Sequence, residues 1–451
     1  MTPISKLNLR VLIYLNPSCV DKVTHKINLE SDSGWCMVKD TILEMNQICD
    51  YHFYVLFPCD HLSQGPIEIW GDKPENVTFV LYPYTNDALT NRYHFDVNAL
   101  SKFFNCYRHD IDLVFTMLPE NVASLKAFMN KRREEVPIVA VCNWMDAKKN
   151  ASYEPEYKYR MLEGAVEANI ILLQSQHHVG VFKKIISGIS DIDLEQKIGV
   201  LNPKACQPRL PGSIGSEIAF PHRVSVVSGF KVMWDLCRDR LHLPIWVTNI
   251  NKAPLSVHPK LIIKHYHNKD DFYERLANVR FGISYHIGYS MWSISVLEMM
   301  ALGKCVLAPR KNAFPEMFDE EYPFLFDTEK GFLENLEYMQ SPEAEDDLAY
   351  WGRNNLQRYL QRFTYQKQSV ELINLFESLV LEASRTPKAK SVERVVRECG
   401  TITKQKLLNK GMTDFGRLGS RAWNKARIGL MRNGIKDNIK NSETEFYVED
   451  K

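Results

Sequence analysis

Residues 281–309 read FGISYHIGYSMWSISVLEMMALGKCVLAP. The stretch opens with a short apolar run that ends in small and polar residues. A helical pattern follows, with Glu298 at its middle and Gly303 at its end, and a second apolar run covers residues 305–308. A strand, a helix and a strand in this order form the repeating unit of a parallel sheet covered by helices, so the stretch predicts an α/β fold.

The same alternation continues on both sides of this stretch. Strands are predicted at residues 10–15, 51–57, 78–82, 113–117, 136–142, 170–173, 224–227, 245–249, 261–263, 281–285 and 305–308, and helices at 35–48, 120–131, 157–168, 232–240, 270–277 and 292–302. Residues 186–222 lack this rhythm and are rich in proline and glycine, as expected of a crossing between lobes. The sequence therefore predicts two doubly wound, Rossmann-like domains, residues 1–205 and 206–385, with a ligand in the cleft between them.

The composition excludes several other classes of protein. The 451 residues are 45% apolar and 25% charged, which is a globular mixture and not that of a disordered chain, a collagen or a coiled coil. No apolar run approaches the roughly 18 residues of a membrane helix, and the first residues lead directly into a strand with no signal peptide. The ten cysteines form no CxxC pair, which favours reduced thiols in a cytoplasmic protein over disulfides.

The charge is distributed unevenly along the chain. Residues 385–451 hold 16 Lys and Arg and 8 Asp and Glu, a net charge of +8, and the rest of the chain carries a net charge of −7. Such a tail is expected either to meet a polyanion or simply to be a solvated basic segment.

The stretch around Glu298 resembles the donor half of retaining glycosyltransferases with two Rossmann-like domains, the GT-B architecture of the group 1 type. Their pattern LEAMA-x-GK-x-V followed by PE corresponds here to LEMMA (residues 297–301), Gly303-Lys304, Val306 and Pro315-Glu316. The resemblance implies a transferase whose donor is a UDP- or GDP-sugar and which needs no cofactor or metal.

The resemblance also implies roles for several side chains. It places Glu298 on the nucleotide ribose and turns the start of its helix, with Ser290 and Ser293, toward the donor diphosphate, because a helix N-terminus favours anions. It implies that Arg223 and Lys231 neutralise that diphosphate. The PHR and PE elements resemble those of enzymes that add mannose to the tRNA base queuosine.

One position departs from the family pattern. The family carries an acidic residue eight positions before the helix glutamate, where it contacts the donor sugar, and this chain has Ser290 there. The donor sugar therefore cannot be assigned by analogy, although Ser290 is still expected to lie at the reacting centre.

The acceptor is expected to enter from the N-terminal lobe. The strand that ends at Cys142 continues into Asn143, Trp144 and Asp146, where the carboxylate could orient an acceptor hydroxyl and the indole could stack on a ring. A loop cap with a packing tryptophan is the alternative. No metal site is predicted, because the triplets Asp110-Ile-Asp112 and Asp191-Ile-Asp193 lie outside the donor half and no Cys/His cluster has zinc spacing.

Residues 390–451 resemble a winged helix-turn-helix domain, a small α+β module. Helical patterns at 391–398, 404–408 and 421–432 precede a predicted hairpin at 435–448, and the third helix carries Arg421, Lys425, Arg427 and Arg432. Such a helix can lie in the DNA major groove with its cations on phosphates. A protein-docking helical module is the alternative.

The two modules together predict a glycosyltransferase that acts on a hydroxymethylated base in double-stranded DNA, the role of bacteriophage DNA glycosyltransferases, in a cytoplasm and without a membrane. One alternative is an enzyme of the same fold that acts on tRNA, protein or glycan. The other is a catalytically degenerate protein that binds nucleic acid through its tail.

Overall fold

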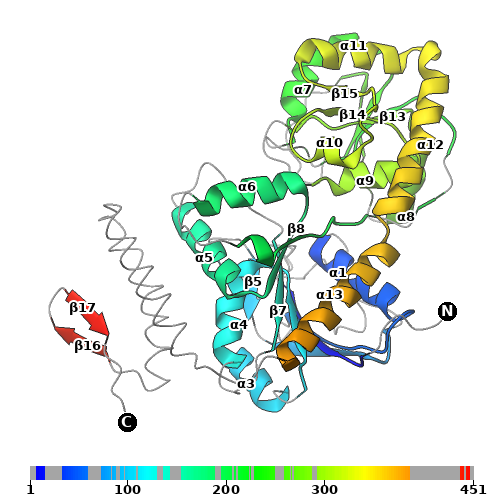
Figure 1. Cartoon of the computed structure of the whole chain (residues 1–451). Coiled ribbons are helices and arrows are strands. Elements are labelled where there is room, and N and C mark those ends of the chain that lie inside the picture. Colours follow the sequence, from blue (N-terminus) through cyan, green and yellow to red (C-terminus); the bar gives the residue numbers. More distant parts are fainter. Residues whose placement is uncertain are drawn as a thin grey trace.

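The computed structural model describes the greater part of the chain. The described residues are 7–15, 33–58, 73–82, 84–87, 92–95, 97–107, 110–129, 136–142, 154–187, 194–205, 208–209, 212–222, 224, 228–248, 258–264, 266, 269–286, 292–385, 437–440 and 443–446. They form two α/β domains, one above the other in Figure 1, each built on a parallel sheet.

The first domain contains a sheet of seven parallel strands. Their order is β3 (Val77–Tyr82), β2 (His52–Pro58), β1 (Arg10–Tyr14), β6 (Leu113–Thr116), β7 (Ile138–Cys142), β8 (Ile170–Leu173) and β9 (Ile198–Val200). Alternate side chains of β1 enter opposite cores, with Val11 and Ile13 on one face and Leu12 and Tyr14 on the other. Both faces are covered by helices, as expected for a parallel sheet.

Two groups of helices cover these faces. On one face lie α1 (Ser33–Met45) and α13 (Tyr365–Arg385), and on the other lie α3 (Val97–Tyr107), α4 (Val122–Met129), α5 (Glu154–Glu167) and α6 (Gln176–Ser187). A small antiparallel pair, β4 (Tyr84–Asp87) and β5 (Arg92–Phe95), accompanies the sheet.

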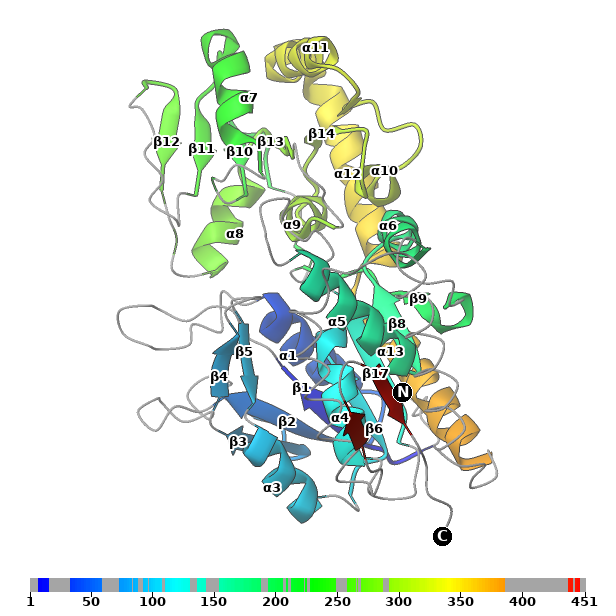
Figure 2. The same ribbon diagram turned by 90° about the vertical axis from the view of Figure 1, so that its left-hand side faces the viewer.

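The second domain contains six parallel strands, which Figure 2 shows above the first domain. Their order is β12 (Leu261–Ile263), β11 (Ile245–Val247), β10 (Ile218–Phe220), β13 (Phe281–Ile283), β14 (Val306–Pro309) and β15 (Leu325–Phe326). The helices are α7 (Phe230–Cys237), α8 (Lys269–Ala277), α9 (Ile294–Ala301), α10 (Phe314–Met317), α11 (Glu329–Gln340) and α12 (Glu345–Arg362). Two doubly wound domains are what the alternation of strands and helices predicted.

One strand of this sheet was predicted at the wrong place. Residues 224–227 were expected to form it, but the strand between β11 and β13 is β10, residues 218–220, and Val224 lies outside it. The three residues of β10 are fully buried. A run of three apolar residues next to Gly215 and Pro221 gives too little periodicity to be distinguished from a linker.

The chain returns to the first domain at its last long helix. Leu372, Ile373 and Phe376 of α13 lie in the core that α1 and the first sheet form, and Ser369 donates a hydrogen bond to the carbonyl of Thr41 at 3.3 Å. Figure 1 shows α12 descending from the second domain and α13 lying beside α1. Residues 206–385 were all predicted to belong to the second domain, and this prediction is wrong for α13, which packs in the first.

Two further expectations concern the cysteines, predicted to be reduced thiols, and membrane helices, of which none was predicted. Within the described part, Cys49, Cys142, Cys237 and Cys305 are buried free thiols, whereas Cys106 is exposed. In the same residues, no helix has both the length and the apolar character needed to cross a bilayer.

In the tail, the structure describes residues 437–440 and 443–446. Strands β16 (Asp437–Lys440) and β17 (Glu443–Phe446) pair antiparallel, which confirms the predicted hairpin. The three predicted helices, with Arg421, Lys425, Arg427 and Arg432, lie outside the described residues.

The close packing of α12 on the end of α9 gives a stability prediction. A Cβ on Gly352 would lie 2.2 Å from the carbonyl oxygen of Gly303, which ends α9 at φ 67°. Gly352→Ala is therefore expected to lower the free energy of unfolding by about 1–3 kcal/mol. Gly180→Ala is the matched control, because nothing lies within 4 Å of its new methyl group and alanine favours the helix by about 1 kcal/mol. Urea unfolding should move the two midpoints in opposite directions; an unchanged Gly352→Ala midpoint would contradict the packing.

Candidate active site

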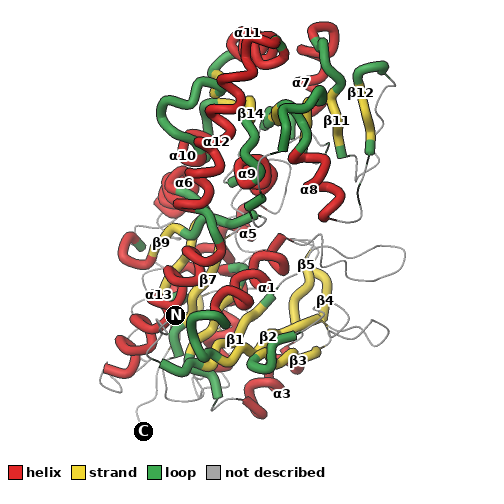
Figure 3. The backbone as a smooth tube through the Cα atoms, turned by 90° about the vertical axis from the view of Figure 1, so that its right-hand side faces the viewer, coloured by secondary structure: helices red, strands yellow, loops and turns green. Residues whose placement is uncertain are grey.

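The carboxyl edges of the two sheets meet at the start of α6. The carboxylate of Glu316 accepts hydrogen bonds from the backbone N–H groups of Gln176, at 2.8 Å, and His177, at 2.5 Å. Helix α6 follows β8, and Glu316 lies on α10, which follows β14. Figure 3 shows α10 and α6 next to one another where the two domains join. An acid of one domain thus caps a helix of the other, which the sequence alone did not indicate.

This contact predicts that Glu316 stabilises the apposition of the domains. Glu316→Ala leaves two N–H groups of a helix start without their acceptor, which costs about 0.5–2 kcal/mol for a helix cap. The expected results are a lower urea midpoint and a larger radius of gyration in solution scattering, whereas Glu320→Ala, an exposed glutamate nearby, should change neither. An unchanged radius together with an unchanged midpoint would show that the cap does not hold the domains.

The strand order of the second sheet indicates where a ligand fits. From β10 the chain proceeds outward through β11 and β12 and then crosses to β13 on the other side of β10. A crevice opens at such a switch point, outside the carboxyl ends of the two diverging strands. In the second domain these ends carry His222 after β10, and Ser284 and His286 after β13.

Two histidines pack against each other at this switch point. The rings of His222 and His286 have centroids 4.6 Å apart and planes at 90°, and Ser284 Oγ lies 3.0 Å from His286 Nδ1. Burial lowers the pKa of His222 well below its usual value, and burial, with Lys311 nearby, lowers the pKa of His286 to about 4. Both imidazoles are therefore neutral at pH 7. Neither histidine was predicted as a site residue, although His286 directly follows the predicted strand at residues 281–285 and His222 lies two residues beyond the end of β10.

Glu298 lies on the buried side of α9, and its residue is only 4% exposed. Its Oε1 accepts hydrogen bonds from Lys269 Nζ at 3.1 Å and from Tyr273 OH at 3.0 Å, both from α8. The guanidinium of Arg209 lies over the Tyr273 ring, 5.2 Å from its centroid. Glu298, the predicted ribose ligand, is thus part of a polar cluster between α8 and α9, and none of its partners was predicted from the sequence.

Lys269 stands where a helix disfavours a cation. It is the first residue of α8, next to the positive end of the helix dipole, and Asp270 and Asp271 follow it in the first turn. Its ammonium contacts the mostly buried carboxylate of Glu298 from a half-exposed position. The ion pair with Glu298 offsets this unfavourable placement.

The other described donor residues have local partners. Ser293 is the N-cap of α9, where its Oγ accepts a hydrogen bond from the N–H of Val296 at 3.3 Å. Lys231, in the first turn of α7, has a side chain that is 85% exposed and pairs with Asp235 at 2.5 Å. Within the described ranges, no hydrogen bond or ion pair joins Lys231 to Glu298 or to the histidine pair.

Several predicted site residues lie outside the described part of the chain. They are Asn143, Trp144, Asp146, Arg223 and Ser290. Their assigned roles remain predictions. The last described residue before the acceptor segment is Cys142, at the carboxyl end of β7.

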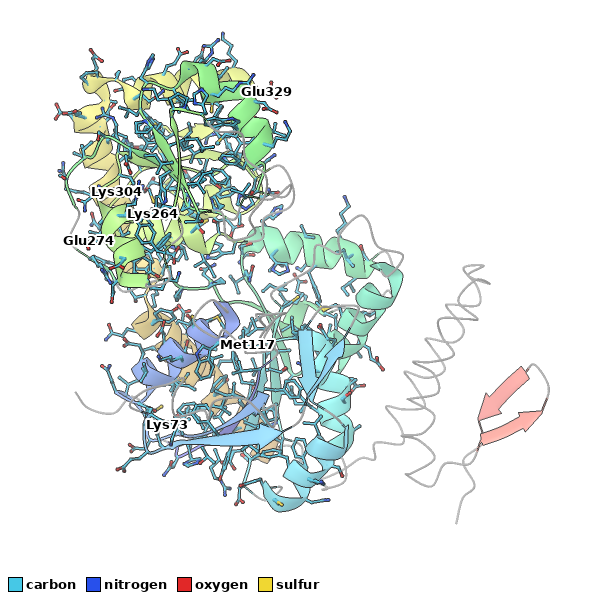
Figure 4. The ribbon with its side chains drawn as sticks, turned by 180° about the vertical axis from the view of Figure 1, so that it is seen from behind. Lys73, Met117, Lys264, Glu274, Lys304 and Glu329 are labelled. Atoms are coloured by element: carbon cyan, nitrogen blue, oxygen red, sulfur yellow. The ribbon has the colours of Figure 1, made fainter. Side chains whose placement is uncertain are left out.

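The acidic triplet at Asp110 and Asp112 is a structural ion-pair network. The guanidinium of Arg10 lies 3.0 Å from an oxygen of Asp110 and 3.2 Å from one of Asp112. These residues lie at the amino ends of β1 and β6, away from the carboxyl edges at which the two sheets meet. Figure 4 shows the two edges: Met117, just past the carboxyl end of β6, lies nearer the second domain than Lys73, which precedes the amino end of β3. In the described ranges no group of three or more His, Cys, Asp and Glu could hold a metal ion.

Comparison with known proteins assigns part of the second domain to a protein family. Residues 240–374, which contain α8, α9 and α10, match a family model described as glycosyl transferase-like. No curated protein matches the sequence significantly. The chain thus carries a glycosyl transferase-like domain in residues 240–374, within a fold of two Rossmann-like domains of the GT-B type.

Solved structures share this fold at low sequence identity. HepE of Anabaena, crystallised with UDP-glucose, is 11% identical with a TM-score of 0.58, and the match covers 82% of this chain and 100% of that one. Sucrose-phosphate synthase of Thermosynechococcus elongatus is 10% identical with a TM-score of 0.61, covering 83% and 100%. A glycosyltransferase of Rickettsia africae is 14% identical with a TM-score of 0.57, covering 84% and 99%.

Proposed function

We propose that this glycosyltransferase transfers a sugar from a UDP- or GDP-sugar to a hydroxyl group on a nucleic-acid base, specifically a hydroxymethylated pyrimidine in double-stranded DNA. The observation that carries the donor half is the cluster of Glu298, Lys269 and Tyr273 within the matched domain. HepE, which shares the fold, was solved with UDP-glucose.

The hydrogen bonds of Glu298 suit a ribose ligand. Both described donors, Lys269 and Tyr273, use the same oxygen, Oε1. A carboxylate can accept at both oxygens, so Oε2 is the acceptor for a ribose hydroxyl. Lys269 and Tyr273 hold the carboxylate in one orientation while that hydroxyl binds. Lys269 also adds positive charge on the side of the site where the nucleotide lies.

The diphosphate requires cations as its charge increases during transfer. Arg223 and Lys231 are proposed to supply them, together with the start of α9 at Ser290 and Ser293. Lys231 is exposed, and among the described residues its one ion pair is with Asp235 in the same helix. Reorienting Lys231 toward a phosphate therefore costs little, because such surface pairs contribute about 0–1 kcal/mol. Asp146 is proposed to orient the acceptor hydroxyl, with Asn143 and Trp144 beside it.

The nucleic-acid acceptor rests on the charge of the tail. A net charge of +8 in residues 385–451 contrasts with −7 in the rest of the chain, which by itself attracts a polyanion weakly. The tail is proposed to bind duplex DNA through Arg421, Lys425, Arg427 and Arg432. A base within a duplex would then have to be flipped out of the stack to reach the cleft.

Two titrations of the full chain test the proposal. Isothermal calorimetry with UDP and with GDP tests the donor, and binding of neither would contradict it. Titration of labelled duplex DNA and of tRNA over a range of salt concentrations tests the acceptor. Tighter binding of duplex DNA, with a slope of log K against log salt of about −0.9 per phosphate contact, is expected. Preference for tRNA would replace the DNA assignment with the tRNA alternative.

A further inference from the structure

The histidine pair at the carboxyl ends of β10 and β13 lies where a doubly wound sheet binds its ligand, and neither the family match nor the proposed roles assign it a function. We propose that His286 hydrogen-bonds a hydroxyl of the sugar being transferred, and that His222 holds the His286 ring in place. The inference rests on the proposed donor and adds the residues that bind its sugar.

The His286 ring is fixed on several sides. Ser284 Oγ is hydrogen-bonded to its Nδ1, the His222 ring packs against it edge to face, and the Phe314 ring lies 5.8 Å from it. The remaining ring nitrogen, Nε2, has no hydrogen bond to any residue that the structure describes. The ring is thus oriented by its surroundings and presents one polar atom to a ligand.

A purely structural role for His222 would cost free energy of folding. It is 6% exposed, and its Nε2 has no hydrogen-bond partner among the described residues. A buried polar atom without a partner is costly, and phenylalanine would fill the same space without that cost. A site that closes around a ligand can supply the missing partner, through either the ligand or a water molecule bound with it.

Because both imidazoles are neutral, a sugar hydroxyl suits this pair better as a ligand than the diphosphate does. A neutral imidazole can donate or accept a hydrogen bond, which matches a sugar hydroxyl, whereas a diphosphate is better neutralised by a cation. The family places an acid on the donor sugar at the position of Ser290 in this chain. The neutral imidazole of His286, four residues before that position in the sequence, takes over the sugar contact that the acid makes in the family.

The test compares a nucleotide sugar with its parent nucleoside diphosphate. The probes are UDP-glucose, UDP-N-acetylglucosamine and GDP-mannose with UDP and GDP, titrated into the full chain by calorimetry. For the nucleotide sugar that the wild type binds best, His286→Leu should weaken binding about 5- to 100-fold while affinity for the diphosphate alone stays within about twofold. His286→Gln, which keeps a neutral donor and acceptor, should retain most of the affinity.

His222→Phe separates function from stability. It is expected to raise or preserve the midpoint of thermal unfolding and still weaken binding of the nucleotide sugar. His242→Gln, an exposed histidine at the amino side of β11, is the matched control and should change neither quantity. A wild type that binds no diphosphate and no nucleotide sugar would remove the proposed donor. A wild type that binds them, with His286→Leu weakening both equally or neither, would overturn the sugar contact alone.

Discussion

Glu298→Ala is expected to weaken the binding of UDP or GDP by about 1–3 kcal/mol, a loss of about 5- to 150-fold. The substitution removes the acceptor for the ribose hydroxyl. It also leaves Lys269 and Tyr273 without the carboxylate oxygen to which both donate. Isothermal calorimetry on the full chain measures the change directly.

Two further variants separate this effect from misfolding. Glu298→Gln keeps the volume of the side chain and one carbonyl oxygen, so it should fold as the wild type does and lose less affinity than the alanine variant. Glu274→Gln is the matched control, because Glu274 is an exposed glutamate on α8, labelled in Figure 4. Unchanged affinity of Glu298→Ala for both diphosphates would contradict the ribose role.

Deletion of residues 391–451 is expected to raise the apparent KM for long hydroxymethylated DNA and to leave kcat largely unchanged. The tail takes no part in the chemistry in this account; it raises the local concentration of DNA at the cleft, an effect that reaches about 10²- to 10⁴-fold when two sites act together. A change confined to KM marks the loss of binding that is equal in the ground and transition states. Steady-state kinetics on long and short duplexes provide the measurement.

A charge-reversal variant refines this test without removing the tail. Lys425→Glu with Arg427→Glu should weaken DNA binding for every sequence and reduce the slope of log K against log salt by about 0.9 for each lost phosphate contact. A truncated enzyme that modifies long DNA as efficiently as the full chain at low substrate would eliminate the tethering role. A tail without measurable affinity for DNA at low salt would favour the protein-docking alternative.

The parts of the fold that the sequence predicted are those with strong local periodicity. Strand β1, helix α1 and the unit from β13 to β14 lie within a few residues of their predicted positions. Strand β10 was missed because its three residues acquire their burial from β11 and β13, which pair with it across long separations in the chain. The amphipathic pattern of α13 predicts a buried face but not the domain that buries it.

The candidate site shows the same division between local and long-range information. Glu298 was predicted as a site residue from a contiguous motif. Its partners Lys269 and Tyr273 lie on another helix and become neighbours only when α8 packs beside α9. His222 and His286 meet because β10 pairs with β13, an adjacency that the order of elements along the chain does not determine.

The most direct test of the central claim is transfer of radiolabelled sugar to DNA. The full-length protein is incubated with a panel of labelled UDP- and GDP-sugars and with duplexes that differ only in carrying hydroxymethylated or plain pyrimidines. We expect label in the hydroxymethylated duplex from at least one nucleotide sugar and none in the plain duplex. An enzyme that leaves hydroxymethylated DNA unlabelled while it glycosylates tRNA, protein or glycan would contradict the acceptor, and one that labels no acceptor from any donor would contradict the proposed reaction.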